Sequence, residues 1–189
     1  AVARRLIGPV PHMRCFHLGA EQRVEFDGLP ATLPAGGFLW LSCERAEFEA
    51  GVAEVQSRLQ VWTGAQLVDL HVRDLLNKQL PSSFDYTAAY DLLVFRRLAV
   101  GGVPEKSDDA PVTREATRRL LAAVDTSPIG FAVFDRVLLT VHPTDCAVRD
   151  FFAQRLLQQP SNGGDARSQG RLPASPADLM LRMSNHMVD

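Results

Sequence analysis

The N-terminal part of the chain carries short apolar runs separated by turn residues, a pattern that predicts strands. Runs over 13–18 and 23–26 flank a turn that contains Gly19, so we expect a β-hairpin there. A loop rich in Pro and Gly follows, and the next run, Phe38–Leu41, is short and apolar throughout. Such a run is typical of a strand buried on both faces, so we expect it in the interior of a sheet.

From Ala46 onward the apolar residues recur at steps of three and four, which indicates an amphipathic helix. The side chains expected to face inward are Phe48, Val52, Val55, Leu59 and Trp62. A second helix is predicted from Gln66 to about Gln79, because Pro81 cannot continue it. Its expected inward residues are Val68, Val72, Leu75 and Leu76.

Strands return in the second half of the chain. The segment 91–100 predicts a strand, and the runs 131–134 and 137–141 predict a hairpin around a two-residue polar turn. Between them, after a polar loop, we expect a helix that carries Ala116, Leu120 and Val124. Thr144 is expected to cap a further helix ending near Gln158, with an apolar stripe of Val148, Phe151, Phe152 and Leu156.

This order of elements predicts an α/β fold in which a mixed β-sheet lies between helices on both faces. We expect residues 1–159 to form that domain and 160–174, which are polar and rich in Gly, to form a mobile linker. Ser175, Pro176 and Asp178 have the spacing of a helix start, so 175–189 is expected to begin a long C-terminal helix. Both ends of the sequence are expected to be cut points in a longer protein.

Composition narrows the function classes. The chain is 46% hydrophobic and 22% charged, has a net charge of -2 and contains no basic block, so we expect no nucleic-acid partner. Its three cysteines have no CxxC spacing and are expected to be reduced thiols in the cytoplasm. No run reaches the roughly 18 apolar residues that a membrane-spanning helix needs.

Motifs for phosphate binding, nucleotide binding, serine hydrolysis and zinc proteolysis are missing from the sequence, so we expect no enzyme activity and no organic cofactor. His12, Cys15 and His17 form the most zinc-like group, but ordinary half-buried strand residues explain them better. The methionines Met180, Met183 and Met187 form an apolar stripe on the last helix, which could pack either on the core or on a partner helix.

Two pairs of residues are candidates for binding a divalent cation. His71 and Asp74 lie three positions apart on a predicted helix and could share one ion, although such a pair usually belongs to a solvated face. Asp108 and Asp109 offer the oxygen ligands that Mg²⁺ prefers, although adjacent carboxylates in a polar loop are usually only solvated.

Several short motifs, taken in order, resemble the soluble domain of the CorA family of divalent-cation transporters. They are GFLWL at 37–41, RDLL at 73–76, QLPS at 79–82, YDLLVFR at 90–96, VLLTVH at 137–142 and SPADLML at 175–181. The sequence departs from the family at Leu80 and Ser82, where the family often has Arg and Lys, and the segment 101–128 is longer than usual.

The resemblance implies a regulatory, ion-sensing domain on the cytoplasmic side of a bacterial inner membrane. It implies a homopentameric channel with Mg²⁺ bound between neighbouring domains. It also implies that 175–189 begin a long stalk helix and that membrane helices and selectivity residues lie beyond Asp189. Mg²⁺, Co²⁺ or Ni²⁺ would be transported, or Zn²⁺ in a near relative of the same family. The matching motifs do not include the regulatory metal ligands. The alternative is a soluble α/β enzyme or ligand-binding module without a membrane part.

Overall fold

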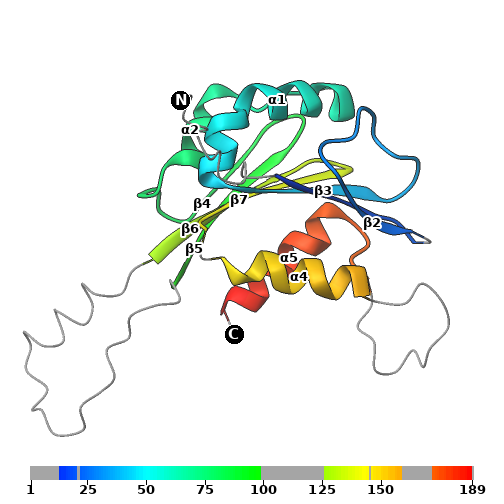
Figure 1. Ribbon diagram of the computed structural model, residues 1–189. Coiled ribbons are helices and arrows are strands. Elements are labelled where there is room, and N and C mark those ends of the chain that lie inside the picture. Colours follow the sequence, from blue (N-terminus) through cyan, green and yellow to red (C-terminus); the bar gives the residue numbers. More distant parts are fainter. Residues whose placement is uncertain (1–12, 21, 99–125, 145, 159–171, 189) are drawn as a thin grey trace, which may run out of the picture.

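The computed structural model describes residues 13–20, 22–98, 126–144, 146–158 and 172–188. The described strands form one seven-stranded sheet in the order β2-β1-β3-β7-β6-β5-β4 (Figure 1). The strands are β1 (Arg14–Leu18), β2 (Arg23–Phe26), β3 (Phe38–Glu44), β4 (Ser83–Tyr86), β5 (Asp91–Leu98), β6 (Thr126–Val133) and β7 (Val137–His142). The helices are α1 (Arg45–Thr63), α2 (Asp69–Leu76), α4 (Ala147–Gln158) and α5 (Pro176–Val188).

The sheet is mixed because β3 and β7 pair in parallel, whereas the other neighbouring strands pair antiparallel. In the parallel pair Leu39 lies opposite Val137, and Glu44 lies opposite His142. The carboxyl ends of these two strands therefore meet at one edge of the sheet. In open α/β sheets this is the edge where functional side chains usually gather.

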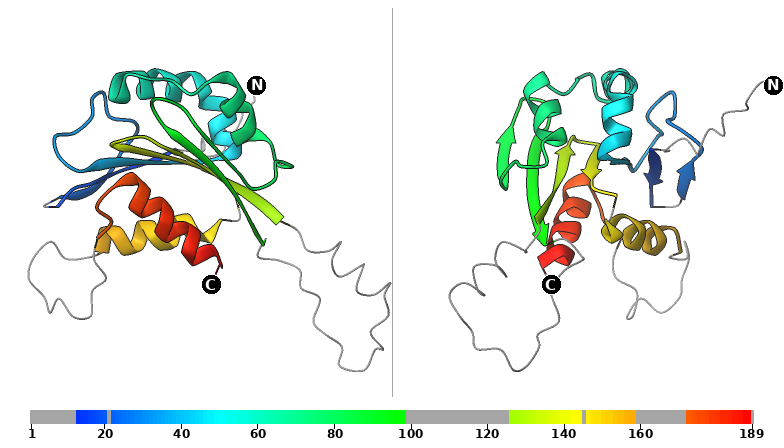
Figure 2. Two further views of the ribbon diagram at one scale, coloured as in Figure 1. Left: turned by 180° about the vertical axis from the view of Figure 1, so that it is seen from behind. Right: turned by 60° about the vertical axis from the view of Figure 1, so that its left-hand side comes forward.

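Helices cover both faces of the sheet, as the sequence predicts. Helices α1 and α2 lie on one face, and α4 and α5 lie on the other (Figure 2). Along β3 the side chains alternate between the two cores: Leu39 and Leu41 pack with Phe48 of α1, whereas Trp40 packs with Leu179 of α5. The strands predicted at 38–41, 91–100 and 137–141 correspond to β3, β5 and β7 of this sheet.

Helix α1 begins with a capping box, in which the Glu44 side chain and the Glu47 side chain each accept a bond from the other residue's backbone. Gly64 ends the helix in the left-handed conformation, with φ 78°. The predicted inward face is confirmed, since Phe48, Val55, Leu59 and Trp62 are buried and Val52 is half-buried.

The structure corrects several predicted elements. Helix α2 is shorter than the predicted 66–79, and Val68 is exposed just before its start because the backbone there is still extended. Strand β4 has no counterpart in the prediction. Thr144 is predicted to cap α4, but the helix begins at Ala147 and the hydroxyl of Thr144 donates to Glu44 instead. Phe151 is exposed beside Phe152, which takes the inward position.

Helix α5 packs on the sheet beside α4. The hydroxyl oxygen of Ser175 accepts the backbone N–H of Asp178 at 3.2 Å, which is the predicted cap. Leu179 and Met183 are buried, and Met180 and Met187 pack against the same core. The methionine stripe therefore belongs to the domain core. The predicted helix around Ala116, Leu120 and Val124 and the predicted linker lie outside the described residues, apart from 172–174.

No helix in the described ranges is both long enough and apolar enough to cross a membrane.

Candidate functional site: a polar ladder between two parallel strands

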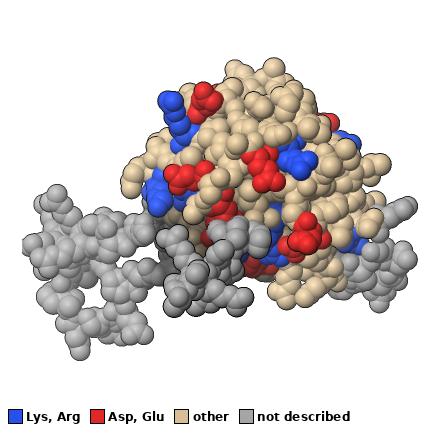
Figure 3. Space-filling view, turned by 45° about the horizontal axis from the view of Figure 1, so that its top comes forward, with Lys and Arg blue, Asp and Glu red and all other residues tan. Residues whose placement is uncertain are grey.

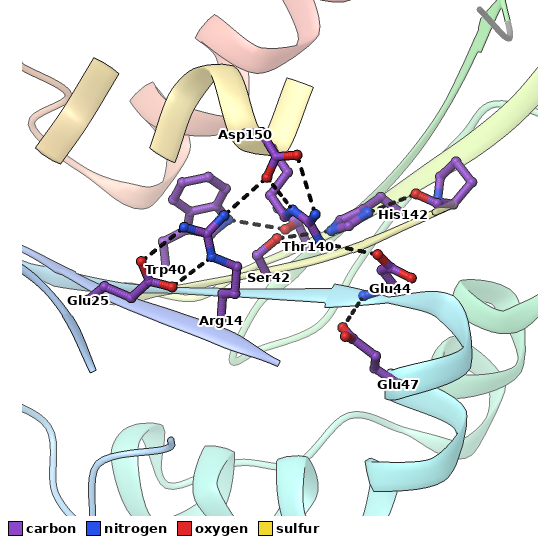
Figure 4. A network of polar contacts seen from close by, with 11 residues as sticks. Arg14, Glu25, Trp40, Ser42, Glu44, Glu47, Thr140, His142 and Asp150 are labelled. Carbon is purple, nitrogen blue, oxygen red and sulfur yellow. Dashed lines mark hydrogen bonds and ion pairs between the residues drawn. The ribbon is translucent and has the colours of Figure 1, made fainter. Parts of the chain in front are cut away.

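Three side-chain hydrogen bonds connect β3 either to β7 or to Thr144, which lies just after β7. They lie on the face of the sheet covered by α4 and α5 (Figure 4). We call these three rungs the polar ladder. They are Trp40 Nε1 to Thr140 Oγ1 at 3.1 Å, Ser42 Oγ to His142 Nε2 at 3.0 Å, and Thr144 Oγ1 to Glu44 Oε2 at 3.0 Å. In each rung the two partners are 100 positions apart in the sequence.

The rungs are diagonal. Ser42 lies opposite Thr140 in the strand register, yet its hydroxyl bonds His142, two residues further along β7. Trp40 lies opposite Leu138 and in the same way reaches Thr140. A shift of the register by one residue would move these side chains to the other face of the sheet, so the ladder holds β3 and β7 in one alignment.

The bonds of His142 define its protonation. Its Nδ1 lies 3.0 Å from the Pro143 carbonyl oxygen, which can only accept, so Nδ1 carries the hydrogen in the neutral ring. Nε2 is then free to accept the hydroxyl hydrogen of Ser42. Burial lowers the pKa of His142, and the nearby Arg149 guanidinium lowers it further, against the raising effects of the Pro143 carbonyl, Glu44 and Asp150.

A serine hydroxyl beside a histidine nitrogen is also the arrangement of an activated nucleophile. Here Ser42 is 0% exposed and His142 is 2% exposed, so the hydroxyl has no open face for a substrate. The group that orients the ring is a backbone carbonyl. The chemistry that this pair can perform is therefore the binding and release of a proton by His142.

Charged side chains surround the open end of the ladder. Arg149 bonds Glu44 at 3.4 Å and Asp150 at 2.9 Å, and Arg14 bonds Asp150 at 3.1 Å and Glu25 at 2.6 Å. These bonds join α4 to β1, β2 and β3. The hydrogen bond from Arg149 holds the pKa of Asp150 below its usual value. Each bond is partly exposed and is expected to contribute only about 0–1 kcal/mol.

His71 lies in a second polar cluster, where it corrects the prediction of a solvated face. Its side chain is buried, its Nδ1 lies 2.7 Å from the Tyr90 hydroxyl, and its Nε2 lies 3.1 Å from Asp85 Oδ2. The Tyr90 hydroxyl also accepts the backbone N–H of Val68 at 3.0 Å. The acidic partner of His71 is therefore Asp85 on β4, and both ring nitrogens are engaged without Asp74.

The predicted metal ligands stay predictions. Asp108 and Asp109 lie outside the described residues, as does His12. In the ranges that the structure describes, no group of three or more His, Cys, Asp or Glu residues is placed to hold a metal ion. Burial raises the pKa of Cys15 to about 12, so its thiol stays protonated and is a poor zinc ligand. His17 instead bonds the Gly36 carbonyl oxygen at 3.1 Å.

A concave feature also lies elsewhere on the described surface. A pocket of about 490 Å³ lies between β1, β2, the end of α4 and the residues before α5, and its described lining includes Leu18, Arg23, Leu156 and Leu172. The face viewed in Figure 3 carries acidic and basic side chains close to one another. That mixture does not resemble the single-sign surface that tracks a nucleic acid.

The sequence contains an indication of the polar ladder that a search for local motifs does not detect. Ser42, Thr140 and His142 are polar residues inside otherwise apolar strands, and a buried polar group needs a partner. The partners lie 100 positions away, so the pairing itself depends on the parallel contact between β3 and β7.

No family model matches this sequence, and no curated protein is detectably similar to it in sequence. Solved structures are similar in fold. The chain superposes on the full-length CmaX protein with a TM-score of 0.60 and 16% identity, over 97% of this chain and 47% of that one. For the ZntB cytoplasmic domain from Vibrio parahaemolyticus RIMD 2210633 the TM-score is 0.58 and the identity 14%, over 94% of this chain and 58% of the other.

A third similar structure is the soluble domain of CorA from Methanocaldococcus jannaschii. Its TM-score is 0.59 and its identity 9%, over 94% of this chain and 57% of that chain. The chain thus spans about half the length of the structures it matches. It shares the fold of the ZntB cytoplasmic domain and of the CorA soluble domain, which confirms at the level of fold the resemblance that the sequence motifs predict.

Proposed function

We propose that the chain is the cytoplasmic, regulatory domain of a CorA-like transporter of divalent cations in a bacterial inner membrane. The observation that carries the proposal is the fold match over 94–97% of the chain to CmaX, a ZntB cytoplasmic domain and a CorA soluble domain. The motifs at 37–41, 90–96 and 137–142, which led to the same family, coincide with β3, β5 and β7. Sequence motifs and architecture therefore point the same way.

In this proposal the domain senses the ion at the boundary between neighbouring subunits of a homopentamer. Carboxylates from two subunits repel each other until a divalent cation bridges them, so ion occupancy changes the stability of the interface. Asp108 and Asp109 remain candidates for such a role. Mg²⁺, or alternatively Co²⁺ or Ni²⁺, is the proposed ion.

The first experiment is sedimentation of the 189-residue chain in chelator and in millimolar Mg²⁺. We expect a monomer in chelator, because α5 buries Leu179 and Met183 on its own sheet, and its exposed Leu181 and Val188 are too few to hold five chains together. Mg²⁺ is expected to promote association. A matched variant, Asp108→Asn with Asp109→Asn, is expected to lose that response. An unchanged response in this variant would remove the pair from the proposal.

The second experiment is to read the coding sequence beyond Asp189. Two apolar spans, each about 20 residues long, are expected there if the domain serves a transporter. A stop codon directly after Asp189, or a long continuation without apolar spans, would refute the proposed function.

Zinc is the second candidate ion, because one of the matching structures is named as a ZntB domain. The same sedimentation series with Zn²⁺, Co²⁺ and Mg²⁺ at equal concentrations separates the candidates. A response to Zn²⁺ alone favours the zinc transporter. A response to Mg²⁺ and Co²⁺ favours the magnesium transporter.

A further inference from the structure

His142 lies where the carboxyl ends of the two parallel strands meet helix α4. Its ring bonds Ser42 of β3 and the carbonyl of Pro143, which leads from β7 toward α4. His142 and Arg149 border the same narrow gap between the sheet and the helices, together with Trp40, Thr140 and Met183. Figure 4 shows the ring in one network of polar contacts with Ser42, Glu44 and Asp150. A change in the charge of the ring therefore affects its contacts with both the sheet and α4.

Addition of a proton changes the hydrogen-bond chemistry at this point. The neutral ring accepts the Ser42 hydroxyl at Nε2, whereas the protonated ring has a hydrogen on both nitrogens and can only donate. Ser42 must then turn its oxygen toward the ring and lose the partner of its own hydrogen. At 0% exposure the hydroxyl cannot use bulk water to replace that partner.

Of the charges around the ring, the Arg149 guanidinium adds to this cost, whereas the Glu44 and Asp150 carboxylates reduce it. Arg149 and Asp150 act on the ring from α4 and Glu44 from β3, and Arg14 of β1 in turn bonds Asp150 and Glu25. The sides toward β6 and α5 present Ile129 and Met183, which carry no charge. Both nearby carboxylates, Glu44 and Asp150, already bond Arg149, so a cationic ring has to compete with that guanidinium for them.

We infer that His142 is the proton-sensitive element of a latch that holds α4 against the ends of β3 and β7. With the ring neutral, the ladder and the ion pairs of Arg149 are complete and α4 is seated. Proton uptake reverses the Ser42 rung, leaves the hydroxyl hydrogen of Ser42 without its acceptor and weakens the bonds of Arg149, which loosens the start of α4. The inference concerns this chain alone and does not depend on the proposed transport function.

The direction of the effect follows from the lowered pKa of His142. A ring freed from the latch titrates near the ordinary value of about 6.5, so the open state binds a proton before the closed state does. The latch is at full strength above that pH. It weakens as the pH falls from about 6.5 through the lower pKa of the closed state.

Hydrogen exchange of the 189-residue chain, followed by mass spectrometry at pH 7.5 and 5.5 and corrected for intrinsic rates, tests the latch. We expect peptides that cover 146–152 to exchange several-fold faster at the lower pH, while peptides of α1 change little. The variant His142→Gln keeps an oxygen that can accept the Ser42 hydroxyl but cannot titrate. Its exchange in α4 is expected to lose the pH dependence.

His186→Gln is the matched control, because His186 stacks on Phe151 of α4 with ring centroids 4.3 Å apart. It should keep the wild-type response to pH. The inference is overturned if His142→Gln responds like the wild type, or if His186→Gln abolishes the response. Should His142→Gln fail to fold, NMR titration of the wild type decides: amide shifts of α4 must follow the midpoint of the His142 ring, and α4 amides that ignore it refute the latch.

Discussion

The indole N–H of Trp40 donates to the hydroxyl of Thr140 at 3.1 Å, two residues beyond Leu138, which lies opposite Trp40 in the strand register. The Trp40 ring also stacks on Phe16 of β1, with centroids 4.7 Å apart. One side chain thus connects three adjacent strands. Its polar atom is satisfied by a residue that only the parallel pairing of β3 and β7 brings near.

Replacing Thr140 by Val tests this rung. The shape of the side chain changes little, but the buried indole N–H of Trp40 loses its acceptor, so we expect a loss of about 1–3 kcal/mol in the free energy of unfolding. Urea denaturation of Thr140→Val, Trp40→Phe and the double variant measures the coupling. The double variant is expected to lose less than the sum of the single losses. Strict additivity would show that the bond contributes nothing.

The elements that sequence patterns locate best are those with one dominant period. Phe38–Leu41 and 137–141 are apolar throughout and form the buried parallel pair, and α1 repeats at three and four. Strand β4 was missed because all of its residues are exposed, so burial leaves no pattern in it. A prediction that lacks β4 cannot bring Asp85 close to His71, so it leaves this histidine on a solvent-exposed face.

The candidate site was harder to predict for a physical reason. Each ladder rung joins positions 100 apart, and spacing rules detect only neighbours on one helix or strand. The residue types gave a partial signal, since Ser42, Thr140 and His142 interrupt apolar runs. The two candidate metal pairs rest on proximity along the sequence instead. For His71 this rule fails, because its acidic partner in the structure lies on another element.

Two aromatic residues of the sheet, Trp40 on β3 and Phe95 on β5, differ in burial, which predicts different losses on truncation. Trp40 is 1% exposed, so Trp40→Ala should cost about 3–5 kcal/mol. Phe95 is only half-buried on β5, so Phe95→Ala should cost clearly less. Thermal and urea unfolding of both variants measure the difference. Equal losses would mean that Phe95 is more enclosed than its exposure indicates.

The cysteine thiols are predicted to be unreactive in the folded chain. Burial raises the pKa of Cys15 to about 12 and that of Cys43 well above its ordinary value, and Cys146 is buried as well. Because the thiolate is the reactive form, a disulfide reagent at pH 8 should label them only on unfolding. Ellman titration with and without guanidinium chloride measures this. Rapid labelling of native Cys15 would contradict the packing of β1 on β3.

Gly36 and Gly37 provide a matched pair for testing the loop that leads into β3. Both adopt the left-handed conformation, with φ 70° and 60°. A methyl group at Gly36 meets nothing within 4 Å, whereas one at Gly37 would collide with the backbone of Leu18 and Gly19. Arg136 holds this loop in place by donating to the carbonyl oxygens of both glycines at 3.0 Å.

Alanine at Gly36 should therefore cost only the left-handed strain, about 1–2 kcal/mol. Alanine at Gly37 carries the same strain and also overlaps a backbone that β1 holds in register, which should add about 1–3 kcal/mol. Urea unfolding of the two variants, compared at equal m-values, gives the difference in the free energy of unfolding directly. If both cost the same, the loop can move away from Leu18 without loss, and the close approach of Gly37 to β1 does not stabilise the start of β3.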